Sequence, residues 1–177
     1  MIDEKRKKEA KSNFDRYLAE GLIKKERNDA SKGMYLKNAE ISLQVAGELS
    51  KSPLKPHLWV IVCAYYSMFY IANAVLISLG YKTQHKIAHK VTSDALIVLV
   101  LHLLKKELLE SYEAMQKDAL DLAAIKAETI IESYDLELDK RSTFQYNMLE
   151  QTKESKAITS LQRAKEFAFE MKKILAV

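Results

Sequence analysis

The chain has 177 residues, of which 48% are hydrophobic and 29% are charged, a composition typical of a globular protein with one core and not of a disordered chain. It has only four glycines and two prolines, and none of them follows Gly80. Because β-proteins need many turns, this pattern excludes most all-β folds and predicts an all-α protein. The single cysteine, Cys63, excludes an internal disulfide framework and a cysteine-rich zinc site, and it predicts a reducing, cytoplasmic location.

Apolar periodicity and capping residues place the expected helices along the chain. A charged N-terminal helix at 3–20 is expected to form a segment of its own, residues 1–27, ahead of a bundle over residues 28–177, the two forming a single globular domain. Further helices are expected over 28–49, 56–79, 84–103, 105–149 and 153–175, with Thr83 capping the 84–103 helix and a break near 134–139. Short connections between these segments predict an up-down helical bundle of five to six helices.

The central segment from Leu58 to Leu79 is uncharged and is long enough to span a bilayer. However, three tyrosines lie near its middle (Tyr65, Tyr66 and Tyr70), whereas spanning helices concentrate aromatic residues at the two interfaces. This distribution favours a helix buried on all sides in a soluble bundle. Pro56 before the segment and Gly80 after it are typical of helix ends. We therefore expect no membrane partner.

Charge is segregated along the chain, although the overall net charge is only +4. Residues 106–139 contain three basic and ten acidic residues, a net −7, whereas residues 140–177 contain eight basic and four acidic residues, a net +4. Basic segments can face phosphate, and opposite charge blocks can pair in an assembly. A solvated charged helix face is the alternative interpretation, and no run of like charge is long enough for a nucleic-acid tail.

His85 and His89 stand four residues apart, the spacing of two metal ligands on one helix face. The residues between them include no glutamate, so the zinc-protease pattern fails, and a pair of exposed histidines at a basic helix start is the simpler interpretation. The sequence also lacks a glycine-rich phosphate loop, a nucleophile elbow and a Glu-x-x-His pair. We therefore expect no metal and no cofactor.

Three segments of the chain stand in a characteristic order. The first is Ala64-Tyr65-Tyr66-Ser67-Met68-Phe69, followed by an apolar run, Gly80 and Gln84-His85-Lys86. The second is residues 139–147, Asp-Lys-Arg-Ser-Thr-Phe-Gln-Tyr-Asn, and the third is a helix with Ala157, Leu161, Ala164 and Phe167. In this order they resemble the signature of HEPN domains (higher eukaryotes and prokaryotes nucleotide-binding), over about residues 28–175. The resemblance implies a helical bundle that forms a homodimer.

Many HEPN domains are metal-independent endoribonucleases, or toxins paired with a small nucleotidyltransferase as antitoxin. Their motif is an arginine followed, after four to six residues, by a histidine, and the two copies meet across the dimer. The imidazole moves the proton of the attacking 2′-hydroxyl, and the guanidinium holds the phosphorane oxygens. Arg141 matches the arginine, but Tyr146 stands at the histidine position. A phenol with a pKa of about 10 is a poor base at pH 7, yet it can donate to phosphate and stack on a base.

The resemblance thus implies Arg141 and Tyr146 as catalytic residues. It also implies a phosphate-binding set, which is Lys140, Arg141, Gln145, Asn147 and His85. We expect a cytoplasmic homodimer that binds RNA or nucleotide phosphate in a shared cleft, with ribonuclease activity and a toxin–antitoxin role both open. An ion pair with Glu137, or with the partner subunit's Asp139, is the structural alternative for Arg141. The alternative function is a non-catalytic protein–protein interaction module, such as the partner of a small nucleotidyltransferase.

Overall fold

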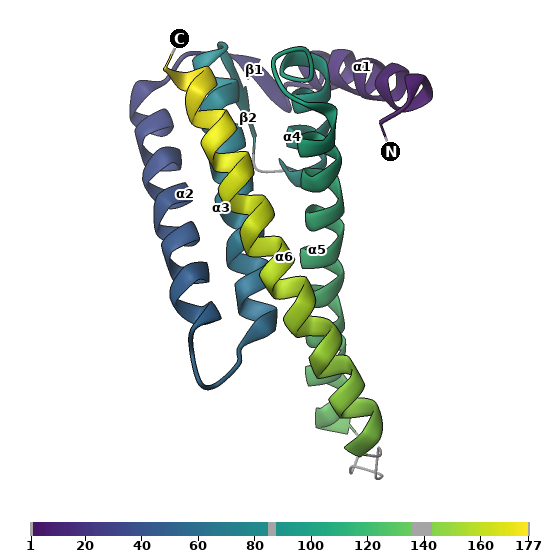
Figure 1. Ribbon diagram of the computed structural model, residues 1–177. Coiled ribbons are helices and arrows are strands. Elements are labelled where there is room, and N and C mark those ends of the chain that lie inside the picture. Colours follow the sequence, from purple (N-terminus) through teal and green to yellow (C-terminus); the bar gives the residue numbers. More distant parts are fainter. Residues whose placement is uncertain (1, 85–87, 136–142, 177) are drawn as a thin grey trace.

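The computed structural model describes residues 2–84, 88–135 and 143–176, and within them the side chains of residues 2–84, 88–121 and 154–176. The elements are α1 (Glu4–Ala19), β1 (Ile23–Lys25), α2 (Asp29–Ser50), α3 (His57–Ser78), β2 (Tyr81–Thr83), α4 (Ala88–Leu99), α5 (Lys106–Asp135) and α6 (Thr143–Leu175). Figure 1 shows α2, α3, α5 and α6 running along the length of the bundle, with α1 across the end at which the C-terminus lies. The predicted all-α bundle is confirmed.

Helix α3 is the core of the bundle because its uncharged sequence can be covered on several sides. Helices α2 and α6 pack along it most extensively, and α4 and α5 contact it as well. Among the described helices, α3 is the one long and apolar enough to cross a membrane, and 78% of its most apolar window is buried within the bundle. Gly80 follows the helix with a φ of 89°, a left-handed conformation that glycine adopts without strain.

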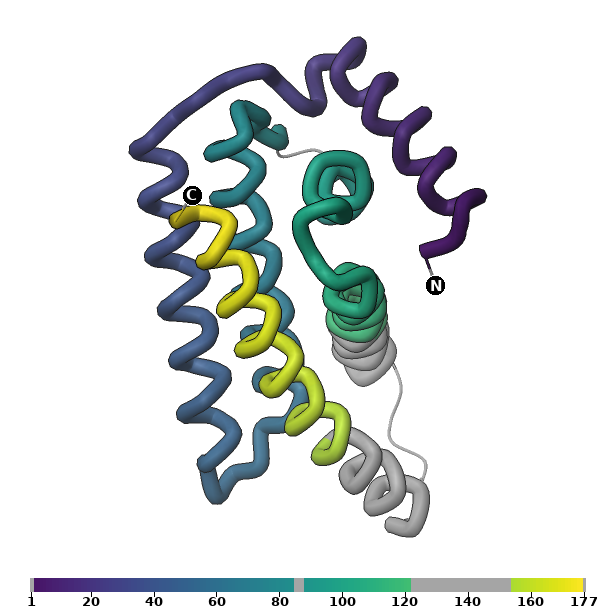
Figure 2. The backbone as a smooth tube through the Cα atoms, turned by 45° about the horizontal axis from the view of Figure 1, so that its top comes forward, coloured from purple at the N-terminus to yellow at the C-terminus, as the bar shows by residue number. Residues whose placement is uncertain are grey.

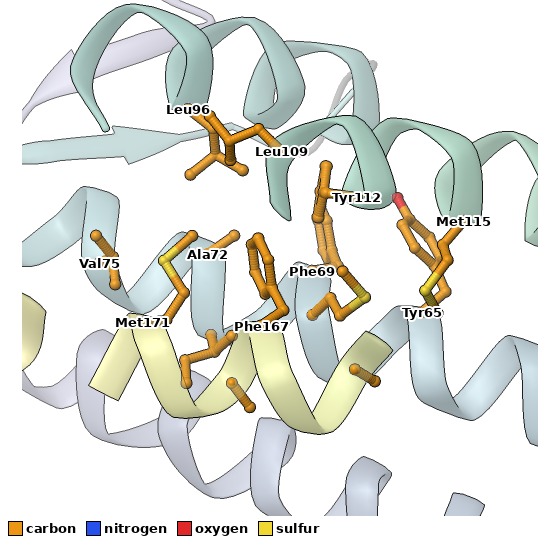
Figure 3. Close-up of a cluster of buried hydrophobic side chains, with 14 of the residues drawn as sticks. Tyr65, Phe69, Ala72, Val75, Leu96, Leu109, Tyr112, Met115, Phe167 and Met171 are labelled. Atoms are coloured by element: carbon orange, nitrogen blue, oxygen red, sulfur yellow. The ribbon is translucent and has the colours of Figure 1, made fainter. Parts of the chain in front are cut away.

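A cluster of buried hydrophobic side chains lies where α3, α5 and α6 meet. Figure 3 shows Phe167 of α6 beside Tyr112 of α5 and Phe69 of α3, with Met171 of α6 next to Ala72 of α3. The rings of Tyr112 and Phe167 are stacked with centroids 5.4 Å apart, and both side chains are almost fully buried. Aromatic pairs of this kind contribute both buried area and a favourable ring geometry.

A two-stranded antiparallel ladder, which the sequence did not predict, ties the N-terminal segment to the start of the α4 region. Ile23 pairs with Thr83, and Lys25 pairs with Tyr81. The prediction that Thr83 caps a helix is wrong, because Thr83 ends β2 and its hydroxyl donates to the Asn73 side chain at 2.5 Å. Strands of three residues carry too little alternation to be recognised from sequence.

The helix ends differ from the predicted ones mainly around the last connection. Helix α5 ends at Asp135, inside the predicted break, but α6 begins at Thr143 and not near 153. At the other end of the chain, Asp3 and Asn28 cap α1 and α2 by accepting from the backbone N–H of Arg6 and Ser31, as short polar side chains do at helix starts. Helix α1 contributes Phe14 and Tyr17 to the common core.

Candidate functional site

Most of the residues that the sequence assigns to the site fall between α5 and α6 or at the start of α6, and His85 falls between β2 and α4. Lys140 and Arg141 lie outside the described residues, and so does His85. Gln145, Tyr146 and Asn147 lie within the first two turns of α6, although their side chains are outside the described part. The assignment of these residues to a site therefore stays a prediction.

Helix α3, which carries the tyrosine-rich segment, and helix α6 are direct neighbours in the bundle. Helix α6 packs along α3, and Figure 2 shows the C-terminal part of α6 running close to α3. The Tyr65-Tyr66 segment and the arginine motif are two separate parts of the HEPN signature that the sequence resembles. Here the first lies on α3, and the second immediately precedes and opens α6.

Tyr65 and His89 form a hydrogen-bonded pair between α3 and α4. The Tyr65 hydroxyl lies 2.7 Å from Nδ1 of His89. Burial raises the pKa of Tyr65, so its hydroxyl stays protonated at neutral pH. A neutral His89 can accept this hydrogen bond at Nδ1 and carry its own proton at Nε2.

The imidazole of His89 lies among aromatic rings. Its centroid is 4.4 Å from that of Phe69 and 5.8 Å from that of Tyr66. Burial lowers the pKa of His89, because an apolar environment disfavours the imidazolium. The interpretation of His89 as an exposed surface histidine is therefore wrong. The His89 side chain is half-buried, and it packs against the aromatic rings of α3.

Replacing His89 with glutamine is expected to remove a pH dependence of stability. The unfolded chain carries a histidine with an ordinary pKa of about 6.5, whereas folding lowers the pKa of His89. As the pH falls below 6.5, the unfolded state takes up a proton that the folded state resists, so the free energy of unfolding decreases, by at most about 1.4 kcal/mol per pH unit. Urea denaturation between pH 7.5 and about 5 measures this slope.

The matched control for that measurement is His102→Gln, because His102 is exposed. We expect the wild type and His102→Gln to share one slope and His89→Gln to be flatter. Equal slopes for all three proteins would contradict the role given to His89.

A buried polar network beside this pair joins α3, β2 and α4. The Asn73 amide nitrogen donates to Oγ1 of Thr92 at 3.2 Å, and its carbonyl oxygen accepts from Thr83. Asn73 also donates to the backbone oxygen of Phe69 at 2.9 Å. All of these side chains are buried, so the network holds the end of β2 against two helices and has a structural role.

A second polar cluster fastens α1 to α4 and α5. One guanidinium nitrogen of Arg6 lies 2.7 Å from Asp94 and 2.7 Å from Glu113. The Asp94 side chain is fully buried and also accepts from the Tyr17 hydroxyl at 3.1 Å and the Asn13 amide at 3.0 Å. A hollow of about 410 Å³ beside the cluster is lined by charges of both signs. The cluster therefore contributes to the docking of α1, together with the Phe14 and Tyr17 side chains that α1 adds to the core.

No group of three or more histidine, cysteine, aspartate or glutamate side chains that could hold a metal ion is present among the described residues. Comparison with known proteins adds no assignment, since no family model, no curated protein and no solved structure matches the chain.

Sequence reasoning missed two features of this region, the Tyr65–His89 pair and the buried Asp94. The available signal for the first was the aromatic, uncharged sequence of α3, against which a nearby histidine could pack. The signal for Asp94 was a lone acidic residue among apolar neighbours, since Val91, Ala95 and Leu96 surround it on α4. A buried carboxylate of that kind requires a cationic partner.

Proposed function

We propose that this protein is a HEPN-type homodimer that binds RNA or nucleotide phosphate in a cleft formed around Arg141 of both chains. The observation that carries the proposal is the packing of α6 on α3, which makes neighbours of the helix with the Tyr65-Tyr66 segment and the helix that begins just after Arg141. The helical bundle is the fold that this class of protein requires.

The chemistry of the motif segment supports binding more strongly than catalysis. Arg141 offers planar, permanently charged donors, and Lys140 adds a second cation. Tyr146, Gln145 and Asn147 can donate hydrogen bonds to phosphate or ribose. A phenol replaces the imidazole that would move the proton of the 2′-hydroxyl, so phosphate binding is the proposed function, and turnover is an outcome to be tested.

Replacing Arg141 with alanine is expected to weaken RNA binding by about tenfold or more, because each dimer loses two charge-assisted phosphate contacts. Gel retardation of tRNA and total RNA by the purified protein at low salt measures the loss. Arg163→Ala is the matched control, since Arg163 is an exposed arginine of α6, the helix that follows Arg141 in the sequence. An equal loss in both variants would mean that binding follows net charge alone.

The same RNA preparations test for turnover. Cleavage that survives EDTA and disappears in Arg141→Ala would establish a metal-independent ribonuclease. Retardation without cleavage would establish a binding protein with a degenerate motif. The absence of both retardation and cleavage in the wild type would overturn the proposal.

A non-catalytic interaction module is the second candidate, and Tyr146 at the position of the motif histidine favours it. The partner that the resemblance implies is a small nucleotidyltransferase, as in toxin–antitoxin pairs. Stoichiometric co-purification with such a protein, unchanged by Arg141→Ala and accompanied by no RNA retardation, would support this alternative.

A further inference from the structure

We propose that a groove between α2 and α6 binds a linear fatty acid of medium chain length. The groove has a volume of about 400 Å³, and its apolar lining comes from Leu36 and Leu43 of α2, Ile71 of α3, and Ala168 and Leu175 of α6. None of these residues is among those assigned to phosphate binding, so the inference is independent of the proposed function.

The groove exists because two helices lie beside each other on α3. Helices α2 and α6 both pack along α3 and also contact each other, and Figure 2 shows the C-terminal end of α6 next to α2. Ala39 and Ala168 line the space between them, and their methyl groups leave room that longer side chains would fill. The volume of the groove lies within the range of small-ligand sites, roughly 300–1,000 Å³.

A buried hydroxyl lies on the α3 side of the groove. Ser67 lines the groove and is fully buried, and its side-chain oxygen has no hydrogen-bond partner among the described residues. By contrast, Ser78 of the same helix donates to the backbone oxygen of Val75 at 2.7 Å. Because a buried hydroxyl without a partner is costly and rare in native proteins, Ser67 indicates a ligand that accepts a hydrogen bond.

The charged residues of the groove favour a carboxylate as the group that accepts this bond. Lys172 of α6 and Glu40 of α2 both line the groove, with Nζ and Oε1 3.8 Å apart and both side chains well exposed. An exposed pair at this distance contributes little to stability, so Lys172 can exchange Glu40 for a carboxylate of the ligand. A carboxylate would accept from the Ser67 hydroxyl and be neutralised by the Lys172 ammonium group.

The length of the groove sets the length of the alkyl chain. Leu36 and Leu43 line it from positions two helical turns apart, which corresponds to about 10 Å along α2. An extended alkyl chain advances by about 1.3 Å per carbon, because its bonds of about 1.5 Å zigzag. A chain of about eight carbons therefore matches the groove.

The first test is a chain-length series measured by isothermal titration calorimetry. The purified protein is titrated with linear carboxylates from about six to about twelve carbons, each below its micelle concentration. We expect binding to tighten about fourfold for each added methylene that is buried, and to level off at about eight carbons, where the groove is filled. No binding of any carboxylate at millimolar concentration, or an affinity that rises steadily through the whole series, would overturn the inference.

Three variants test the polar contacts with octanoate as the probe. Ser67→Ala is expected to weaken binding by about tenfold, because the bound carboxylate loses a hydrogen bond. Lys172→Gln is expected to weaken binding by about threefold, and Glu40→Gln to tighten it by about threefold, because Glu40 competes with the ligand for Lys172. Ser78→Ala and Lys173→Gln are matched controls on α3 and α6 and are expected to bind as the wild type does. Circular dichroism verifies that each variant is folded.

Octanol and octylamine, which have alkyl chains of the same length, test the class of ligand. We expect octanoate to bind more tightly than either, because it alone pairs with Lys172. Octanol that binds as tightly as octanoate, or octylamine that binds more tightly and is weakened by Glu40→Gln, would overturn the assignment of a fatty acid. Equal effects of Ser67→Ala and Ser78→Ala on octanoate binding would contradict the role given to the buried hydroxyl.

Discussion

Replacing Phe167 with alanine is expected to lower the free energy of unfolding by about 3–5 kcal/mol, because it removes a fully buried ring and leaves a cavity. Phe167 stacks on Tyr112 with centroids 5.4 Å apart and has no exposed surface. It also connects α6 to α5 within the core, as Figure 3 shows. Chemical denaturation followed by circular dichroism measures the loss.

Phe169 provides an internal control two residues away on the same helix. It is 62% exposed and its ring lies 4.4 Å from the ammonium group of Lys173, an exposed cation–π contact worth about 0.5–1 kcal/mol. Phe169→Ala is therefore expected to cost less than about 1 kcal/mol. Similar losses for the two variants would mean that α6 is packed with a different face toward α3 and α5.

The second large effect concerns Arg6, whose removal is expected to cost about 3–5 kcal/mol, the usual consequence of leaving a buried charge without its partner. The guanidinium lies 2.7 Å from both Asp94 and Glu113, and the Asp94 side chain is fully buried. In Arg6→Ala, Asp94 would retain only neutral donors and the distant Lys90 ammonium at 4.0 Å. Denaturation at neutral pH measures the loss, and proteolysis shows whether α1 detaches.

Lys11→Ala tests whether the loss of stability in Arg6→Ala depends on the burial of its ion pairs and not only on the presence of an ion pair. The ammonium group of Lys11 lies 2.7 Å from Asp15, the same distance as in the Arg6 pairs, but both side chains are more than half exposed. Exposed pairs contribute about 0–1 kcal/mol. If Lys11→Ala proved as costly as Arg6→Ala, the buried cluster would not be what fastens α1.

The sequence was sufficient for features that depend on local chemistry. The uncharged run from Leu58 to Leu79 predicted the central buried helix, and Gly80 predicted its end. A break was also predicted near 134–139, and α5 is described as far as Asp135. These features follow from periodicity and from backbone preferences, which act within a few residues.

Features that depend on contacts between distant segments were not predictable. Arg6 meets Glu113 across 107 positions of sequence, and Ile23 pairs with Thr83 from another part of the chain. No local pattern in either segment indicates which distant residue it will contact. The same holds for His89, whose burial against Tyr65 and Phe69 depends on how α4 docks. The candidate site at Arg141 comes from a resemblance in sequence and lies outside the described residues.

The central claim is that Arg141 from each of two chains reaches one shared cleft. It is tested most directly by placing a spin label at that position, with Arg141→Cys in a Cys63→Ser background, and by measuring the distance between the two labels of the dimer by pulsed electron paramagnetic resonance. Two arginines that bind one phosphate group hold their backbones close together, so we expect a distribution centred below about 30 Å. A distribution centred beyond that distance, or labels separated by the length of α5, about 45 Å, would contradict the account.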